Sequence, residues 1–147
     1  MNQDEPTTAS HVILMRQPQV EPGSGDAPLS AAGRVAALAA AKAMYGEGHH
    51  PGPLLASPTR AGRETAAIIA AAVHIAPEDV YYSDNLQGAT SDALEIELRT
   101  LAKAFTLVTL VGHNPGLSEL GRILAQDPKV PDYEPGQWRY LPWPPPY

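Results

Sequence analysis

Short apolar runs alternate along the chain with longer amphipathic segments. The run 11–15 (HVILM) lacks polar alternation, and 105–111 (FTLVTLV) has the clearest pattern of a buried strand. Strands of this kind are typical of a parallel sheet that is covered on both faces. Two briefer candidate strands are 54–56 and 80–83. Four intervening segments predict helices: 31–45, 59–73, 91–104 and 117–125.

Strands that alternate with helices of this length predict an α/β domain with a mainly parallel central sheet. Helix-capping residues support the assignment, since Ser30 precedes the first helix, Ser57-Pro58 opens the second and Ser91 is expected to cap the third. The domain is expected to span 11–126, after a polar N-terminal extension at 1–10.

The C-terminal segment 127–147 differs from the rest, because it is rich in proline and holds both tryptophans. Its prolines donate no backbone hydrogen bonds, so it cannot form a central strand. Two interpretations stay open. Either 133–147 binds a protein partner or a second copy of the chain, or Trp138 to Leu141 forms an edge strand while Trp143 packs on its own domain.

The composition limits the classes of ligand and partner that the protein is expected to bind. A net charge of −6 and a pI near 5.2 argue against a basic surface for nucleic acid or anionic lipid. Without cysteine there is neither a disulfide nor thiolate chemistry. No apolar stretch approaches the ~20 residues of a membrane span, so a cytoplasmic protein is expected. His49-His50 lacks further ligands, and we expect no metal and no cofactor.

Candidate functional residues follow the predicted strands. In an open parallel sheet, ligands bind beyond the carboxyl ends of the strands. The residues at these positions are Arg16, Gln17, Ser57, Gln87 and His113.

Four motifs, in order, resemble those of the histidine phosphatase superfamily. The last motif, Val111 to Leu117 (VGHNPGL), is similar to the SixA-like phosphohistidine phosphatase branch at every residue. The other three are 14–18 (LMRQP), 28–34 (PLSAAGR) and 57–66 (SPTRAGRETA). The resemblance implies a three-layer sandwich and a metal-independent phosphatase site. In the family, a neutral histidine attacks phosphorus while two arginines and a second histidine hold the phosphoryl oxygens.

Three positions depart from the family pattern. Gln17 stands in place of the nucleophilic histidine, and an amide nitrogen is not a useful nucleophile because its lone pair is delocalised. Pro18 replaces the following glycine, and Ala61 takes the place of the second phosphate-binding arginine. Arg60 lies one residue early, a helical rotation of about 100°.

The resemblance therefore implies a site that binds phosphate, a phosphorylated group or a phosphoprotein without ordinary turnover. Arg16, His113 and Asn114 are its expected ligands, with Arg60 as a further candidate. Two alternatives are an active phosphohistidine or phosphoester phosphatase, in which water attacks directly, and an interaction module that acts through the C-terminal segment.

Overall fold

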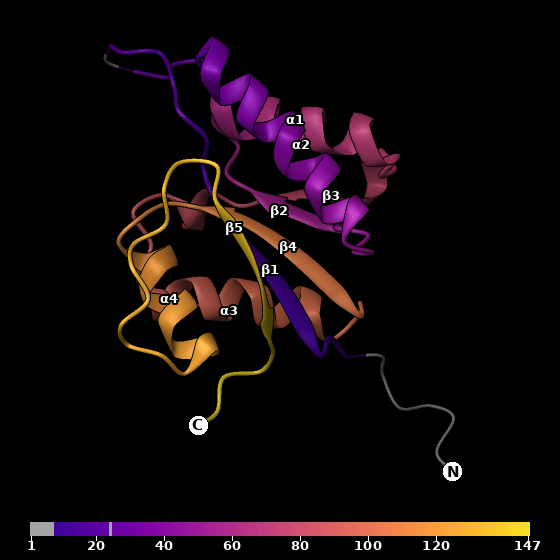
Figure 1. Ribbon diagram of the computed structural model, residues 1–147, viewed down its shortest axis with the longest axis vertical. Helices are drawn as coiled ribbons and strands as arrows, with labels where there is room; N and C mark the ends of the chain where they lie inside the picture. The colour runs from indigo at the N-terminus through magenta and orange to yellow at the C-terminus, as the bar shows by residue number, and fades with distance from the viewer. Residues whose placement is uncertain (1–7, 24) are drawn as a thin grey trace.

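A five-stranded sheet lies at the centre of the structure, a computed structural model that describes residues 8–23 and 25–147 (Figure 1). The strand order is β3-β2-β4-β1-β5. All pairs are parallel except β1 with β5, so the predicted mainly parallel sheet is confirmed. The strands are β1 (His11–Arg16), β2 (Leu54–Ala56), β3 (Val80–Tyr82), β4 (Leu107–Gly112) and β5 (Trp138–Pro142).

Helices cover both faces of this sheet and make the predicted three layers. Figure 1 shows α1 and α2 on one side and α3 and α4 on the other. Successive β1 residues serve opposite faces: Val12 and Leu14 belong to the core beneath α3 and α4, and Ile13 and Met15 to the core beneath α1 and α2. The unbroken apolar run of β1 follows from this two-sided burial. The helices are α1 (Ala31–Gly46), α2 (Arg60–Val73), α3 (Ser91–Ala102) and α4 (Gly116–Ala125).

The starts of the helices agree only in part with the expected capping residues, because Thr59 and not Ser57 caps α2, where its side chain accepts the N–H of Gly62. The side chain of Ser30 accepts the N–H of Gly33 at the start of α1, as predicted. The prediction for α3 was wrong by one residue, because Thr90 caps the helix and Ser91 is its first residue. Threonine and serine are both good N-caps, and the sequence pattern does not separate them. Within the described residues, none of the helices has the length and apolar character to cross a membrane.

Residues 1–7 of the expected N-terminal extension lie outside the described residues. The extension is tied to the domain before β1 begins. Ala9 is buried, and its N–H donates to the carbonyl of Ala102 at 2.7 Å.

The C-terminal segment completes the sheet. β5 pairs with β1 in antiparallel register, with Leu141 opposite Val12. Trp143 is 8% exposed and packs in the same core as Leu141. The interpretation of this segment as an edge strand with a buried Trp143 is therefore confirmed.

We predict that Trp143→Ala lowers the free energy of unfolding by about 3 kcal/mol, the scale of removing a buried large aromatic side chain. Tyr147→Ala is the matched control, because Tyr147 is 77% exposed and surface substitutions usually change stability by less than about 0.5 kcal/mol. Urea unfolding measures both. A stable Trp143→Ala protein with altered association in sedimentation would instead assign Trp143 to a partner.

Candidate functional site

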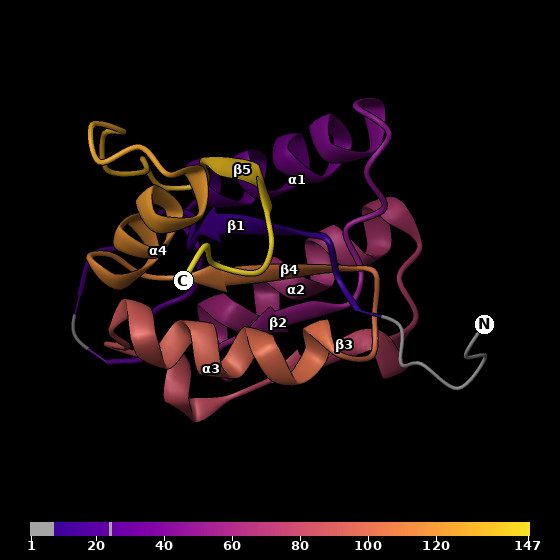
Figure 2. The same ribbon diagram turned by 90° about the horizontal axis from the view of Figure 1, so that it is seen from below.

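A pocket of about 300 Å³ opens where β1 and β4 end side by side. The two strands run toward the same edge of the sheet, at which the loop before β5 also lies (Figure 2). The volume is at the lower end of the range for ligand sites, roughly 300–1,000 Å³, and suits a small group. The lining residues are Arg16, Gln17, Pro18, Gln19, Val20, His113, Asn114 and Pro135.

Parallel pairing explains why three of the predicted residues meet here. Arg16 is the last residue of β1 and pairs with Gly112, the last residue of β4. His113 follows Gly112 directly, and the N–H of Gln17 donates to the carbonyl of Gly112 at 2.8 Å. The adjacency of β1 and β4 thus brings Arg16, Gln17 and His113 to one pocket.

The Gln17 side chain is 8% exposed and is fixed by α2. Its amide nitrogen donates to Thr65 Oγ1 at 2.8 Å, and Thr65 Oγ1 donates to the carbonyl of Ala61 at 2.8 Å. Since the hydroxyl of Thr65 has only one proton, it accepts from Gln17, which must present its NH₂ group there. The amide orientation is therefore determined, and one Gln17 donor is already used inside the protein.

His113 is half-buried beside Arg16, and its Nε2 has no hydrogen-bond partner among residues 8–23 and 25–147. Burial, and to a smaller extent the Arg16 guanidinium, lower the pKa of His113 below 6.5. The imidazole is therefore neutral near pH 7 without a ligand. An unpartnered buried polar atom carries a free-energy cost that a bound group can relieve.

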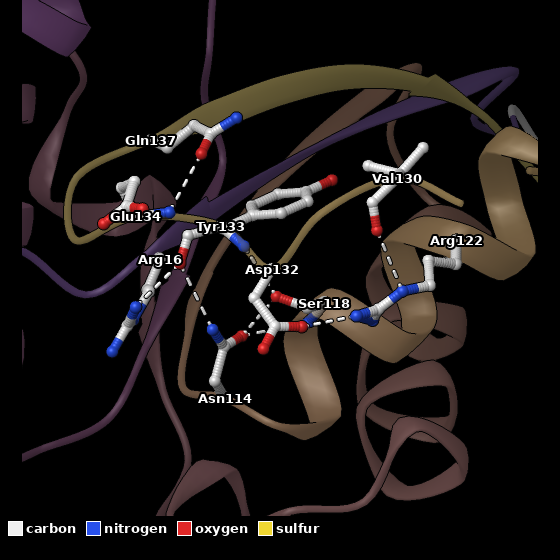
Figure 3. A network of polar contacts seen from close by, with 9 residues as sticks. All are labelled: Arg16, Asn114, Ser118, Arg122, Val130, Asp132, Tyr133, Glu134 and Gln137. Atoms are coloured by element: carbon white, nitrogen blue, oxygen red, sulfur yellow. Dashed lines mark hydrogen bonds and ion pairs between the residues drawn. The ribbon is translucent and has the colours of Figure 1, made fainter. Parts of the chain in front are cut away.

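Arg16 is also half-buried, and its backbone is held by the segment before β5. The backbone N–H of Arg16 donates to the carbonyl of Gln137 at 2.9 Å, and the carbonyl of Arg16 accepts from the N–H of Gly136 at 3.0 Å. Its Nη1 donates to the carbonyl of Tyr133 at 2.7 Å (Figure 3). A guanidinium has five N–H donors, so this contact leaves others for a ligand. Figure 3 shows another nitrogen of the guanidinium pointing away from Tyr133.

Asn114 links the pocket to α4. Its Nδ2 donates to the carbonyl of Tyr133 at 3.2 Å, and its Oδ1 accepts from the N–H of Ser118 at 3.2 Å. The N–H of Leu117 donates to the carbonyl of His113 at 3.0 Å. Free N–H groups at the start of a helix favour anions, but two of those in the first turn of α4 are already bonded within the chain. Side chains, rather than the helix end, must supply most of the donors.

The other candidates lie outside this pocket. Ser57 Oγ lies 2.9 Å from Thr59 Oγ1, and Gln87 lines a separate pocket with Asp26 and Asp84. The Arg60 side chain is 58% exposed and pairs with Glu64 at 3.4 Å. Convergence of Ser57 with Arg16 and His113 was predicted, but Ser57 is not among the lining residues. Its strand, β2, is separated from β1 by β4.

Three residues of the site were missed from the sequence: Thr65, Ser118 and Tyr133. Thr65 and Ser118 lie inside helices, and both are fully buried. A buried hydroxyl on an otherwise apolar helix face requires a hydrogen-bond partner, which was the available signal. Tyr133 acts through its main chain, and no side-chain pattern indicates that.

Comparison with solved structures gives several matches. A protein assigned as the phosphohistidine phosphatase SixA of Nakamurella multipartitia is 24% identical, with a TM-score of 0.76 over 92% of this chain and 85% of that one. Its counterpart from Agrobacterium tumefaciens is 25% identical, with a TM-score of 0.67 over 78% and 76%. A SixA complexed with tungstate is 16% identical, with a TM-score of 0.74 over 90% and 96%. No family model and no curated protein matches the chain.

The fold and the pocket at its strand ends define the class: this is a protein of the histidine phosphatase superfamily fold. Its fold is similar to that of the SixA-like phosphohistidine phosphatases. The fold expected from the resemblance of the four motifs is thereby confirmed.

We predict that His113 makes the protein less stable in mild acid. Its pKa is lowered on folding, so the unfolded chain binds more protons and stability falls as pH drops through about 6.5. His113→Gln should remove the part of this fall in stability that comes from protonation of His113. Urea unfolding of both proteins at pH 7.5 and 5 measures it. An equal pH dependence in the two proteins would contradict a neutral, buried His113.

Proposed function

We propose that this SixA-like protein binds phosphate, or the phosphorylated side chain of a protein, between Arg16 and His113 without ordinary phosphatase turnover. The observation that carries the proposal is the composition of one pocket. It contains the arginine and the second histidine of the family motifs, with Gln17 where the family has its nucleophile.

The pocket has suitable donors for an oxyanion. Arg16 is permanently charged. The N–H groups that do not bond to Tyr133 belong to a planar guanidinium, which can donate two parallel hydrogen bonds to an oxyanion. His113 is neutral when the pocket is empty. An anion next to its ring raises its pKa, so that binding favours the protonated imidazole as a second charged donor.

Two departures from the family site argue against ordinary turnover. The Gln17 nitrogen has no basic lone pair and donates to Thr65. Ala61 is buried, with no charge where the family has its second arginine. Losing one transition-state donor typically costs a factor of ~10²–10³ in rate, and losing the nucleophile removes covalent catalysis as well.

The size of the pocket favours a small phosphoryl group, whether free or on an exposed side chain. A similar solved structure is a SixA complexed with tungstate, an oxyanion. That protein is 16% identical to this chain, so it supports the chemistry of the proposal and not the identity of a ligand.

We predict that sulfate raises the melting temperature of the protein and that Arg16→Ala abolishes this rise. A ligand that binds only the folded state adds RT ln(1 + [L]/Kd), about 2.7 kcal/mol at a hundredfold excess over Kd. Arg60→Ala is the matched control, because it removes the same charge from a side chain outside the pocket.

Differential scanning fluorimetry with increasing sulfate, at constant ionic strength, measures all three proteins. An undiminished rise in Arg16→Ala would place the anion elsewhere. Loss of the rise in Arg60→Ala would place it near Glu64 and α2.

We predict that the protein releases phosphate from phosphohistidine no faster than its His113→Ala variant, and that acid quenching traps no phosphoenzyme. Gln17→His alone should restore little activity, because Pro18 and Ala61 remain. Phosphate release by purified protein measures this. Turnover at the rate of an ordinary phosphatase, abolished in His113→Ala, would establish the active alternative with direct attack by water.

A further inference from the structure

Four residues form a closed set of hydrogen bonds at the edge of the pocket (Figure 3). The N–H of Tyr133 donates to Ser118 Oγ at 2.9 Å, and Ser118 Oγ donates to Asn114 Oδ1 at 2.6 Å. Asn114 Nδ2 and Arg16 Nη1 both donate to the carbonyl of Tyr133, at 3.2 and 2.7 Å. We call Arg16, Asn114, Ser118 and the Tyr133 main chain the Ser118 network.

The direction of every bond in the Ser118 network is determined by chemistry. A backbone N–H can only donate, so Ser118 accepts from Tyr133 and has its single proton left for Asn114. Asn114 Oδ1 accepts, which turns the NH₂ group of Asn114 toward the Tyr133 carbonyl. That carbonyl has two lone pairs, and Asn114 and Arg16 use them. The hydroxyl of Ser118 therefore orients Asn114 together with the backbone N–H of Ser118, and the hydroxyl makes the shorter of the two contacts.

Packing fixes the position of the Tyr133 peptide. The Tyr133 side chain is 1% exposed and lies so close to Gly121 that a Cβ added there would be 2.5 Å from the hydroxyl oxygen. Burial raises the pKa of Tyr133 to about 12, so its hydroxyl is neutral near pH 7. Arg122 Nε also donates to the carbonyl of Val130 at 3.0 Å. The segment before β5 is thereby also held against α4 at Gly121 and Arg122, beyond the Ser118 contact.

We propose that Ser118 is a positioning residue for oxyanion binding. Through Asn114 and the Tyr133 peptide, it holds the Arg16 guanidinium in the plane in which its free N–H groups face the pocket. The inference rests on the proposed function, since it takes Arg16 as an anion ligand. It also gives the C-terminal segment a role in the site, because Tyr133 supplies the carbonyl that restrains Arg16.

The experiment compares Ser118→Ala with Arg122→Lys. Ser118→Ala removes the two hydrogen bonds of the hydroxyl, to Asn114 and from the Tyr133 N–H, without changing charge or touching the ligand. Arg122→Lys keeps the charge but loses the planar fork that contacts the same segment from the same helix. Both variants weaken the contact between α4 and the segment, so a loss of stability alone does not separate them. Sulfate affinity, measured by NMR titration of the folded proteins, does.

We expect Ser118→Ala to bind sulfate about tenfold more weakly than the wild type, the change that corresponds to about 1.4 kcal/mol. We expect Arg122→Lys to stay within about twofold, well below that tenfold step. In Ser118→Ala the resonance of the Arg16 Nε–H should also move toward that of a solvent-exposed arginine. Ser118→Cys, which keeps the size but has only a weak donor, should lie between the wild type and Ser118→Ala, and serves if Ser118→Ala does not fold.

The outcomes separate the inference from the function on which it rests. If wild-type protein binds no sulfate at the pocket, the proposed function is wrong. If the wild type binds and both Ser118→Ala and Ser118→Cys bind equally well, the positioning role is wrong and the function stands. If Arg122→Lys and Ser118→Ala lose sulfate affinity equally, the effect comes from weaker docking of the segment before β5 on α4. That result would also overturn the inference.

Discussion

The parallel pairing of β1 with β4 is the constraint on which the proposed site depends. Its register sets Arg16 opposite Gly112, so Arg16, Gln17 and His113 lie next to one another at the ends of the two strands. Both strands are buried in the centre of the sheet, and a slip of one residue would turn every side chain of β1 to the opposite core. Packing in the two apolar cores therefore fixes the positions of the polar residues in the pocket, which lies outside both cores.

The C-terminal segment adds the second constraint. β5 pairs with β1 on the edge opposite β4. The residues just before β5, Gly136 and Gln137, hydrogen-bond to the main chain of Arg16. The Tyr133 peptide restrains the guanidinium, and its side chain fills the space that Gly121 leaves. A proline-rich segment suits this position, because an edge strand needs backbone donors on only one side. Stability and ligand orientation thus depend on the same stretch of chain.

Much of this arrangement was predictable from local sequence. Every α-helix and strand of the domain was expected within a few residues, because apolar patterns and capping residues are local signals. The positions of Arg16 and His113 followed from the rule on strand ends. The role of Thr65 did not, since it binds Gln17 from 48 residues away. Nor did that of the Tyr133 carbonyl, 117 residues from Arg16. Main-chain partners carry no residue signature, and the docking of the segment is a tertiary event.

The most direct test of the proposed anion site is a crystal structure of the protein soaked with tungstate, with tungsten located by anomalous scattering. We predict one strong peak in the pocket, with tungstate oxygens within about 3 Å of both Arg16 and His113, the usual length of such hydrogen bonds, and no bond from any side chain to tungsten. A peak bound elsewhere, with this pocket empty, would contradict it.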